Sequence, residues 1–138
     1  MNISKIKFVA ETSKNSNPGA GFFIDFLVNV EGVNCAGNEV ALPGEPGQHK
    51  EFVYDLRAPV DINKFSAKSF HFSADANGGG NPQLGWLPSA LTVYGAEANS
   101  NDWHYVAGVS SWPDNKWVGV SAAPSSTILR DFYLSDIH

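Results

Sequence analysis

The chain has 138 residues, of which 43% are hydrophobic and 12% aromatic, and its formal net charge is −5 at pH 7. This length fits one domain with one core, the apolar content is too high for a disordered chain, and the acidic balance disfavours nucleic acid and anionic membranes as partners. No apolar run reaches the roughly 20 residues of a membrane-spanning helix, and a single cysteine, Cys35, excludes an intrachain disulfide and a cysteine-based zinc site.

Short runs in which apolar and polar residues alternate predict β-strands along the first part of the chain. Residues 5–10 place Ile6, Phe8 and Ala10 on one face, as a half-buried strand requires. Residues 22–30 are apolar at every second position and partly apolar between, so we expect a central strand there. Residues 31–50 are rich in glycine and proline and are expected to form a loop, with one short edge strand near Val40.

The second part of the chain continues with short β-type runs separated by turn residues. Residues 52–56 and 70–75 alternate again, and Asp61 between them is a candidate N-cap for a single helical turn. Four further strands are expected at residues 91–94, 103–109, 116–121 and 127–134. Eight or nine short strands in one domain over residues 1–138 predict an all-β fold, an antiparallel two-sheet β-sandwich of about eight strands.

Common enzyme motifs are absent from the sequence, including the nucleophile elbow, the His-Glu-x-x-His pair and the phosphate-binding loop. His71 and His104 lie on predicted strands, opposite the apolar faces, so adjacent strands would bring them together as a metal pair or an acid–base pair. One alternative function is therefore a small hydrolase or lyase that uses His71 or His104 with Asp75 or Asp102. Solvated surface histidines are the simpler interpretation.

The segment from Ser73 to Ser89 contains three consecutive glycines, which favour positive φ angles or a close approach of a ligand to the main chain. Asp75, Asn77 and Asn81 add side-chain oxygens along this turn. Calcium prefers oxygen ligands of this kind, so these three residues are a candidate calcium site. A plain connecting loop is the alternative.

Tryptophan is concentrated in the last third of the chain. Pro113–Asn115 carries turn residues and predicts a hairpin in which Trp112 and Trp117 face each other. We expect Trp103 and Trp112, which adjoin polar turns, to be exposed, whereas for Trp86 and Trp117 core packing is an equal alternative.

An exposed indole offers a flat apolar surface on which the C–H face of a sugar stacks, while short polar side chains bind its hydroxyl groups. Carbohydrate is therefore the predicted ligand. The candidate ligand-binding residues are Trp86, Asp102, Trp103, Trp112, Asp114 and Asn115.

The order of several short motifs is similar to that of a known family. Thr12 and Asn17-Pro-Gly-Ala-Gly21 precede a long apolar strand, Glu51–Leu56 follows, and Asp75–Gly80 leads into a tryptophan and a strand in Gly85–Tyr94. In these features the chain resembles PLAT/LH2 domains, and it also resembles galactose-binding-like and carbohydrate-binding-module jelly rolls. The segment from Trp112 to Trp117 departs from the PLAT pattern. The resemblance implies an eight-stranded sandwich, loop-mounted calcium in some members, and docking to lipid, protein or sugar without catalysis.

The sequence thus predicts a non-catalytic carbohydrate-binding module or lectin, with calcium as a candidate cofactor. A PLAT-like domain that docks to lipid or protein is the main alternative, beside the small enzyme. Open edge strands and exposed tryptophans also allow self-association. The N-terminal residues show no signal-peptide pattern, so the chain is expected in the cytoplasm as written, or outside the cell if a leader was removed.

Overall fold

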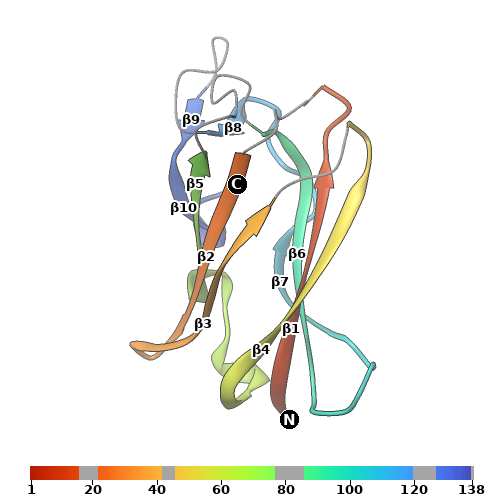
Figure 1. Ribbon diagram of the computed structural model, residues 1–138, viewed down its shortest axis with the longest axis vertical. Helices are drawn as coiled ribbons and strands as arrows, with labels where there is room; N and C mark the ends of the chain where they lie inside the picture. The colour runs from red at the N-terminus through yellow and green to blue at the C-terminus, as the bar shows by residue number, and fades with distance from the viewer. Residues whose placement is uncertain (16–21, 42–45, 77–85, 120–126, 138) are drawn as a thin grey trace.

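The computed structural model describes the backbone in five stretches of the chain, residues 1–15, 22–41, 46–76, 86–119 and 127–137. Side chains are described in these stretches except at residues 22–23, 38–41, 75–76 and 127–128. Within them the chain forms two four-stranded antiparallel sheets that lie face to face (Figure 1), which confirms the predicted all-β sandwich. No helix in these stretches is long and apolar enough to cross a membrane.

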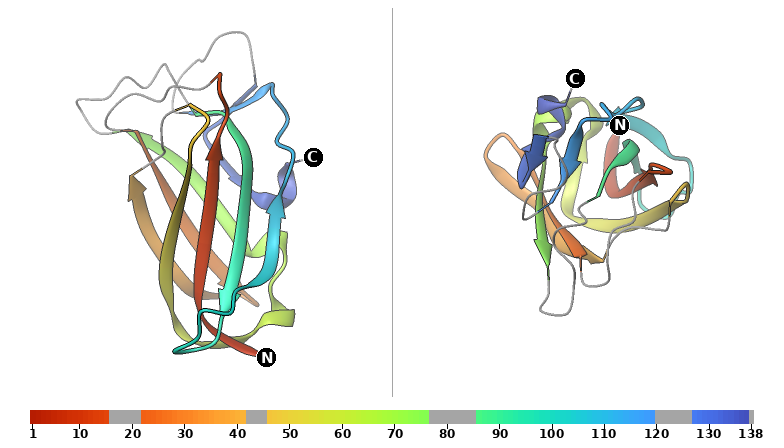
Figure 2. Two further views of the ribbon diagram at one scale, coloured as in Figure 1. Left: turned by 90° about the vertical axis from the view of Figure 1, so that its right-hand side faces the viewer. Right: turned by 90° about the horizontal axis from the view of Figure 1, so that it is seen from above.

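The first sheet has the strand order β4-β1-β6-β7, and every neighbouring pair is antiparallel. Its strands are β1 at Asn2–Thr12, β4 at His49–Asp61, β6 at Pro88–Ala96 and β7 at His104–Val109. The left view of Figure 2 shows the outer face of this sheet turned toward the viewer. The alternation predicted for β1 is confirmed, because Ile6, Phe8 and Ala10 are buried while Lys5 and Lys7 point to the other face.

The second sheet has the order β10-β5-β2-β3, again antiparallel throughout. Its strands are β2 at Phe22–Val30, β3 at Val33–Ala41, β5 at Phe70–Ala76 and β10 at Asp131–Tyr133. The predicted central position of β2 is confirmed. The expected loop at residues 31–50 is wrong in its extent, because β3 fills much of it as an edge strand and β4 begins at His49.

The connection between β2 and β3 explains that error. Val30 pairs with Val33, so Glu31 and Gly32 form a two-residue hairpin loop. Both have positive φ angles, of 53° and 82°, as a type I′ turn requires. Such a turn matches the twist of the strands, and it turns the chain back into an antiparallel strand.

Three 3-10 helices and a two-stranded parallel pair complete the described elements. The helices are η1 at Ile62–Lys64, η2 at Ala67–Ser69 and η3 at Leu134–Asp136, and the parallel pair joins β8 at Lys116–Val118 to β9 at Thr127–Leu129. The predicted N-cap is confirmed, because the Asp61 side chain accepts a hydrogen bond from the backbone N–H of Asn63 at 3.0 Å. The predicted hairpin around Pro113–Asn115 is wrong, since β8 pairs with β9 in parallel.

The core lies between the inner faces of the two sheets and is rich in aromatic rings. Phe8 of β1 lies at its centre, with ring centroids 4.8 Å from Phe26, 5.6 Å from Phe72 and 6.2 Å from Phe70 of the second sheet. These edge-on contacts join the two sheets directly and stabilise the sandwich beyond the burial of apolar area. Because the core fills the space between the inner faces, we expect a functional site on the outer faces or at the ends of the sandwich.

Candidate functional site

Two of the tryptophans predicted to bind ligand are buried. Trp86 is fully buried, and its indole N–H donates to the hydroxyl of Thr12 at 3.0 Å. Trp112 is 6% exposed, its N–H donates to the Lys116 carbonyl at 2.8 Å, and its ring meets Phe132 edge-on at 5.5 Å. The expected exposure of Trp112 is therefore wrong: its polar neighbours in sequence turn outward while the indole completes the core.

The remaining predicted ligand-binding residues are accessible, but they do not form one site. Asp114 and Asn115 are exposed in the turn before β8. Asp102 and Trp103 lie in the β6–β7 connection, which runs at the end of the sandwich opposite to β8 (Figure 1). The structure therefore separates the predicted set into two groups at opposite ends.

The two strand histidines also lie apart, because His71 belongs to β5 of the second sheet and His104 to β7 of the first. Each has a carboxylate neighbour, His71 with Asp131 at 3.6 Å and His104 with Asp102 at 3.5 Å. The predicted His71–His104 pair is thus wrong. The Asp102 side chain is 83% exposed, so its pair with His104 lies on an open surface, whereas general acid–base chemistry depends on a positioned group in a sheltered site.

The candidate calcium residues lie at the limit of the described structure. Asp75 is in β5, but its side chain is not described, and Asn77 and Asn81 lie outside the described residues. Among the side chains that are described, no group of three or more histidine, cysteine, aspartate or glutamate residues is arranged to hold a metal ion. The calcium site stays a prediction.

A group of aromatic and cationic side chains gathers on the outer face of the first sheet. Trp103 directly precedes β7, yet its ring lies over two lysines of β1, the strand on the far side of β6. The ammonium nitrogen of Lys7 is 4.7 Å from the ring centroid and that of Lys5 is 5.2 Å away, both within the range of a cation–π interaction. The half-buried indole therefore reaches across β6 and is held on the sheet by two cations.

Two tyrosines extend this group toward the edge of the sheet. Tyr94 of β6 pairs in register with Lys7 on one side and with Tyr105 of β7 on the other. Their rings meet edge-on with centroids 6.3 Å apart, and Tyr105 is 63% exposed. We call Lys5, Lys7, Tyr94, Trp103 and Tyr105 the aromatic surface.

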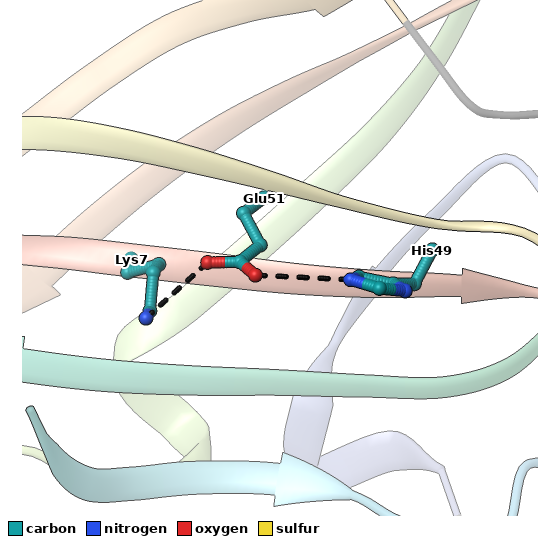
Figure 3. Close-up of polar contacts among 3 residues, drawn as sticks. All are labelled: Lys7, His49 and Glu51. Atoms are coloured by element: carbon teal, nitrogen blue, oxygen red, sulfur yellow. Dashed lines mark ion pairs between the residues drawn. The ribbon is translucent and has the colours of Figure 1, made fainter.

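Charged groups of β4 border the aromatic surface on its other side. Glu51 forms an ion pair with Lys7, with Oε1 3.3 Å from the ammonium nitrogen, and its other oxygen is 3.7 Å from Nε2 of His49 (Figure 3). Asp55 stands opposite Lys5 in register. The aromatic surface therefore combines ring faces with both donors and acceptors, which is the mixture that a polyhydroxylated ligand requires.

Where the described residues line it, the space between the two sheets is too small for a ligand. An apolar gap between the two sheets, bounded by Phe8, Phe26 and Trp86 among others, measures about 20 Å³. This volume holds little more than one water-sized group. A site for a molecule as large as a sugar is therefore on the surface of the described structure.

Sequence reasoning found Trp103 and the neighbouring Asp102 but missed the other four residues of the aromatic surface. Strand alternation is only part of the missing signal: it places Tyr94 outward next to the buried Val93, whereas Tyr105 has the parity of the buried Ala107 and reaches the outer face through the register shift between Val93 and Tyr94. Aromatic residues at outward positions of neighbouring strands converge on one face. That convergence depends on strand order, which the sequence does not state.

Comparisons of the chain with protein-family models, with curated proteins and with solved structures found no match. The resemblance to PLAT/LH2 domains and to carbohydrate-binding modules accordingly stays a prediction. A functional proposal therefore depends on the geometry and chemistry of the aromatic surface.

Proposed function

We propose that this chain is a non-catalytic carbohydrate-binding module and that the aromatic surface is its binding site. One observation carries the proposal: Trp103, Tyr94 and Tyr105 gather on the outer face of one sheet, and Tyr105 is 63% exposed there. Outward positions of a sheet are normally polar because they face water. Two tyrosines at such positions, with the indole of Trp103 lying over the same face, leave apolar ring surface available to a ligand.

The chemistry of this surface fits a sugar better than a purely apolar ligand. Aromatic rings bind the C–H face of a pyranose, while hydroxyl groups need donors and acceptors at its edge. Lys7 and Glu51 supply both, and the pair fixes their geometry at 3.3 Å. Asp102 and His104 add a second acceptor–donor pair next to Trp103.

A glycan array followed by titration of intrinsic tryptophan fluorescence tests the proposal. We expect sugar binding that shifts the emission of Trp103, and a loss of affinity of about tenfold or more in Trp103→Ala and in Tyr105→Ala, which remove stacking area. Tyr133→Ala is the matched control, because Tyr133 is also exposed but lies on β10 of the second sheet. Binding that persists in both surface variants, or no glycan bound at all, would refute the proposal.

A PLAT-like docking role is the second candidate, favoured by Val53 of β4, which is 54% exposed and pairs in register with Lys7 beside the aromatic surface. Apolar groups at such a place also suit a lipid or protein surface. The net charge of −5 opposes anionic lipid unless calcium bridges the two. Co-sedimentation with phosphatidylserine vesicles, with calcium and with a chelator, tests the lipid-docking role: binding that requires calcium supports both this role and the predicted calcium site, and no sedimentation in either condition refutes calcium-bridged docking to anionic lipid.

A further inference from the structure

We propose that the aromatic surface selects a sugar unit carrying a single carboxylate and that the ammonium group of Lys5 binds this carboxylate. This inference rests on the proposed carbohydrate binding and names the class of sugar. It follows from a difference between the two lysines of the surface.

Lys7 is already neutralised by the protein. Its ammonium lies 3.3 Å from Glu51 and its side chain is 17% exposed, so it is held between the carboxylate and the rings of Trp103 and Tyr94. A ligand anion that approached Lys7 would have to displace Glu51. Lys7 therefore serves mainly to position the surface.

Lys5 has a different set of neighbours. Asp55 is its register partner on β4, yet among the described residues no carboxylate lies within ion-pair distance of the Lys5 ammonium. The ammonium instead lies 5.2 Å from the centroid of the Trp103 ring. A cation–π contact uses its charge but leaves N–H donors available.

The position of Lys5 therefore matches a carboxylate on a stacked sugar. The Lys5 ammonium lies over the face of the Trp103 ring, 5.2 Å from its centroid, so a pyranose that packs against this ring meets the ammonium directly. A charge-assisted hydrogen bond to a carboxylate is stronger than one to a neutral hydroxyl group. This gives preference for an acidic sugar over its neutral counterpart.

The charge around the site limits how acidic the ligand can be. Glu51, Asp55 and Asp102 border the surface, and the whole chain carries a net charge of −5. A densely sulfated chain would meet this field at every unit, whereas a single carboxylate meets it once and gains the pair with Lys5. The expected ligand is therefore a uronic acid or a similar monocarboxylate sugar within an otherwise neutral glycan.

The test uses matched glycan pairs, each an oligosaccharide that ends in glucuronic acid and its carboxyl-reduced counterpart that ends in glucose. At low ionic strength, where screening is weak, we expect the acidic member to bind about two- to fivefold more tightly, the range of an exposed ion pair. Lys5→Gln should abolish this preference, which is read as the ratio of the two affinities so that any change in the binding of the neutral member cancels. Lys5→Arg should retain it.

The control is Lys68→Gln, which removes the same charge from η2, outside the aromatic surface. Equal binding of both members, a preference that survives in Lys5→Gln, or tighter binding of a heparin oligosaccharide would overturn the inference. In those cases Trp103-dependent binding of the neutral member would still support the proposed function. If no pair binds at all, the proposed function fails and this inference with it.

Discussion

Trp86 and Trp112 lie in the interior of the sandwich, whereas Trp103 lies on the outer face of the first sheet. The two interior indoles each donate their N–H to a protein oxygen, Thr12 Oγ1 and the Lys116 carbonyl. Trp103 is held differently, through the face of its ring by the ammonium groups of two lysines.

This difference shows what decides the place of a tryptophan in a sandwich. Burial of an indole is more favourable when its N–H finds a partner, because an unpaired buried donor costs about 1–3 kcal/mol. Trp103 and Trp112 both adjoin polar turns, so their neighbours in sequence do not distinguish them. Trp112 differs in two contacts: its N–H has an acceptor in the Lys116 carbonyl, four residues further along the chain, and its ring has a tertiary partner in Phe132.

The largest effect is expected from truncating the interior indole. Trp86→Ala should lower the free energy of unfolding by about 3–5 kcal/mol, because a large ring leaves a cavity that the two sheets cannot fill. Trp103→Ala should lower it by about 1 kcal/mol or less, since the side chain is half-buried on a surface. Urea denaturation of both variants measures the difference. Similar losses in the two would contradict the distinction between an interior and a surface tryptophan.

The Thr12 hydroxyl tests whether the N–H partner is what keeps Trp86 inside. Thr12→Val keeps the shape of the side chain but leaves the Trp86 N–H unpaired at a site that is 2% exposed, so we expect a loss of about 1–3 kcal/mol. Thr12→Ser retains the hydroxyl and is the matched control. A loss in the serine variant with little or none in the valine variant would show that the methyl group, rather than the hydrogen bond, is what matters.

Much of the fold was predictable because alternation is a local property. The alternating pattern predicts the inner face of β1 at Ile6, Phe8 and Ala10, and the N-cap residue Asp61 predicts the helical turn after β4. β3 was largely missed because its glycine and polar residues resemble a loop, and because Glu31-Gly32 is not among the common turn pairs.

The candidate site was less predictable because it depends on strand order. Only the order β4-β1-β6-β7 brings Trp103, which is distant in sequence, over Lys5 and Lys7. The error at Trp112 has the same origin, since the parallel pairing of β8 with β9 replaced the expected hairpin. Non-local pairings of this kind leave no signature in a short window of sequence.

A variant of Lys7, with a smaller expected effect, tests how Trp103 is held on the first sheet. Lys7→Met keeps a long unbranched side chain but removes the ammonium that lies 4.7 Å from the indole centroid. We expect a loss of about 1 kcal/mol or less in stability, as for other exposed cation–π and ion pairs, together with stronger acrylamide quenching of Trp103. In a Trp103→Phe background the added quenching should vanish; if it persists, another indole is responsible.

The smallest effect is expected from Tyr54, whose partly buried phenol should change how stability depends on pH. Burial raises the pKa of Tyr54, whose ring lies 4.6 Å from Phe26 between the sheets. Below pH 10 the phenol is protonated in both states and contributes nothing to the pH dependence of stability. Above about pH 10 the unfolded chain loses this proton first, so the free energy of unfolding falls as the pH rises. Between neutral pH and pH 11, Tyr54→Phe should therefore lose less stability than the wild type, as measured by urea denaturation. An identical decline in the two proteins would show that the Tyr54 phenol ionises as readily in the folded chain as in the unfolded one.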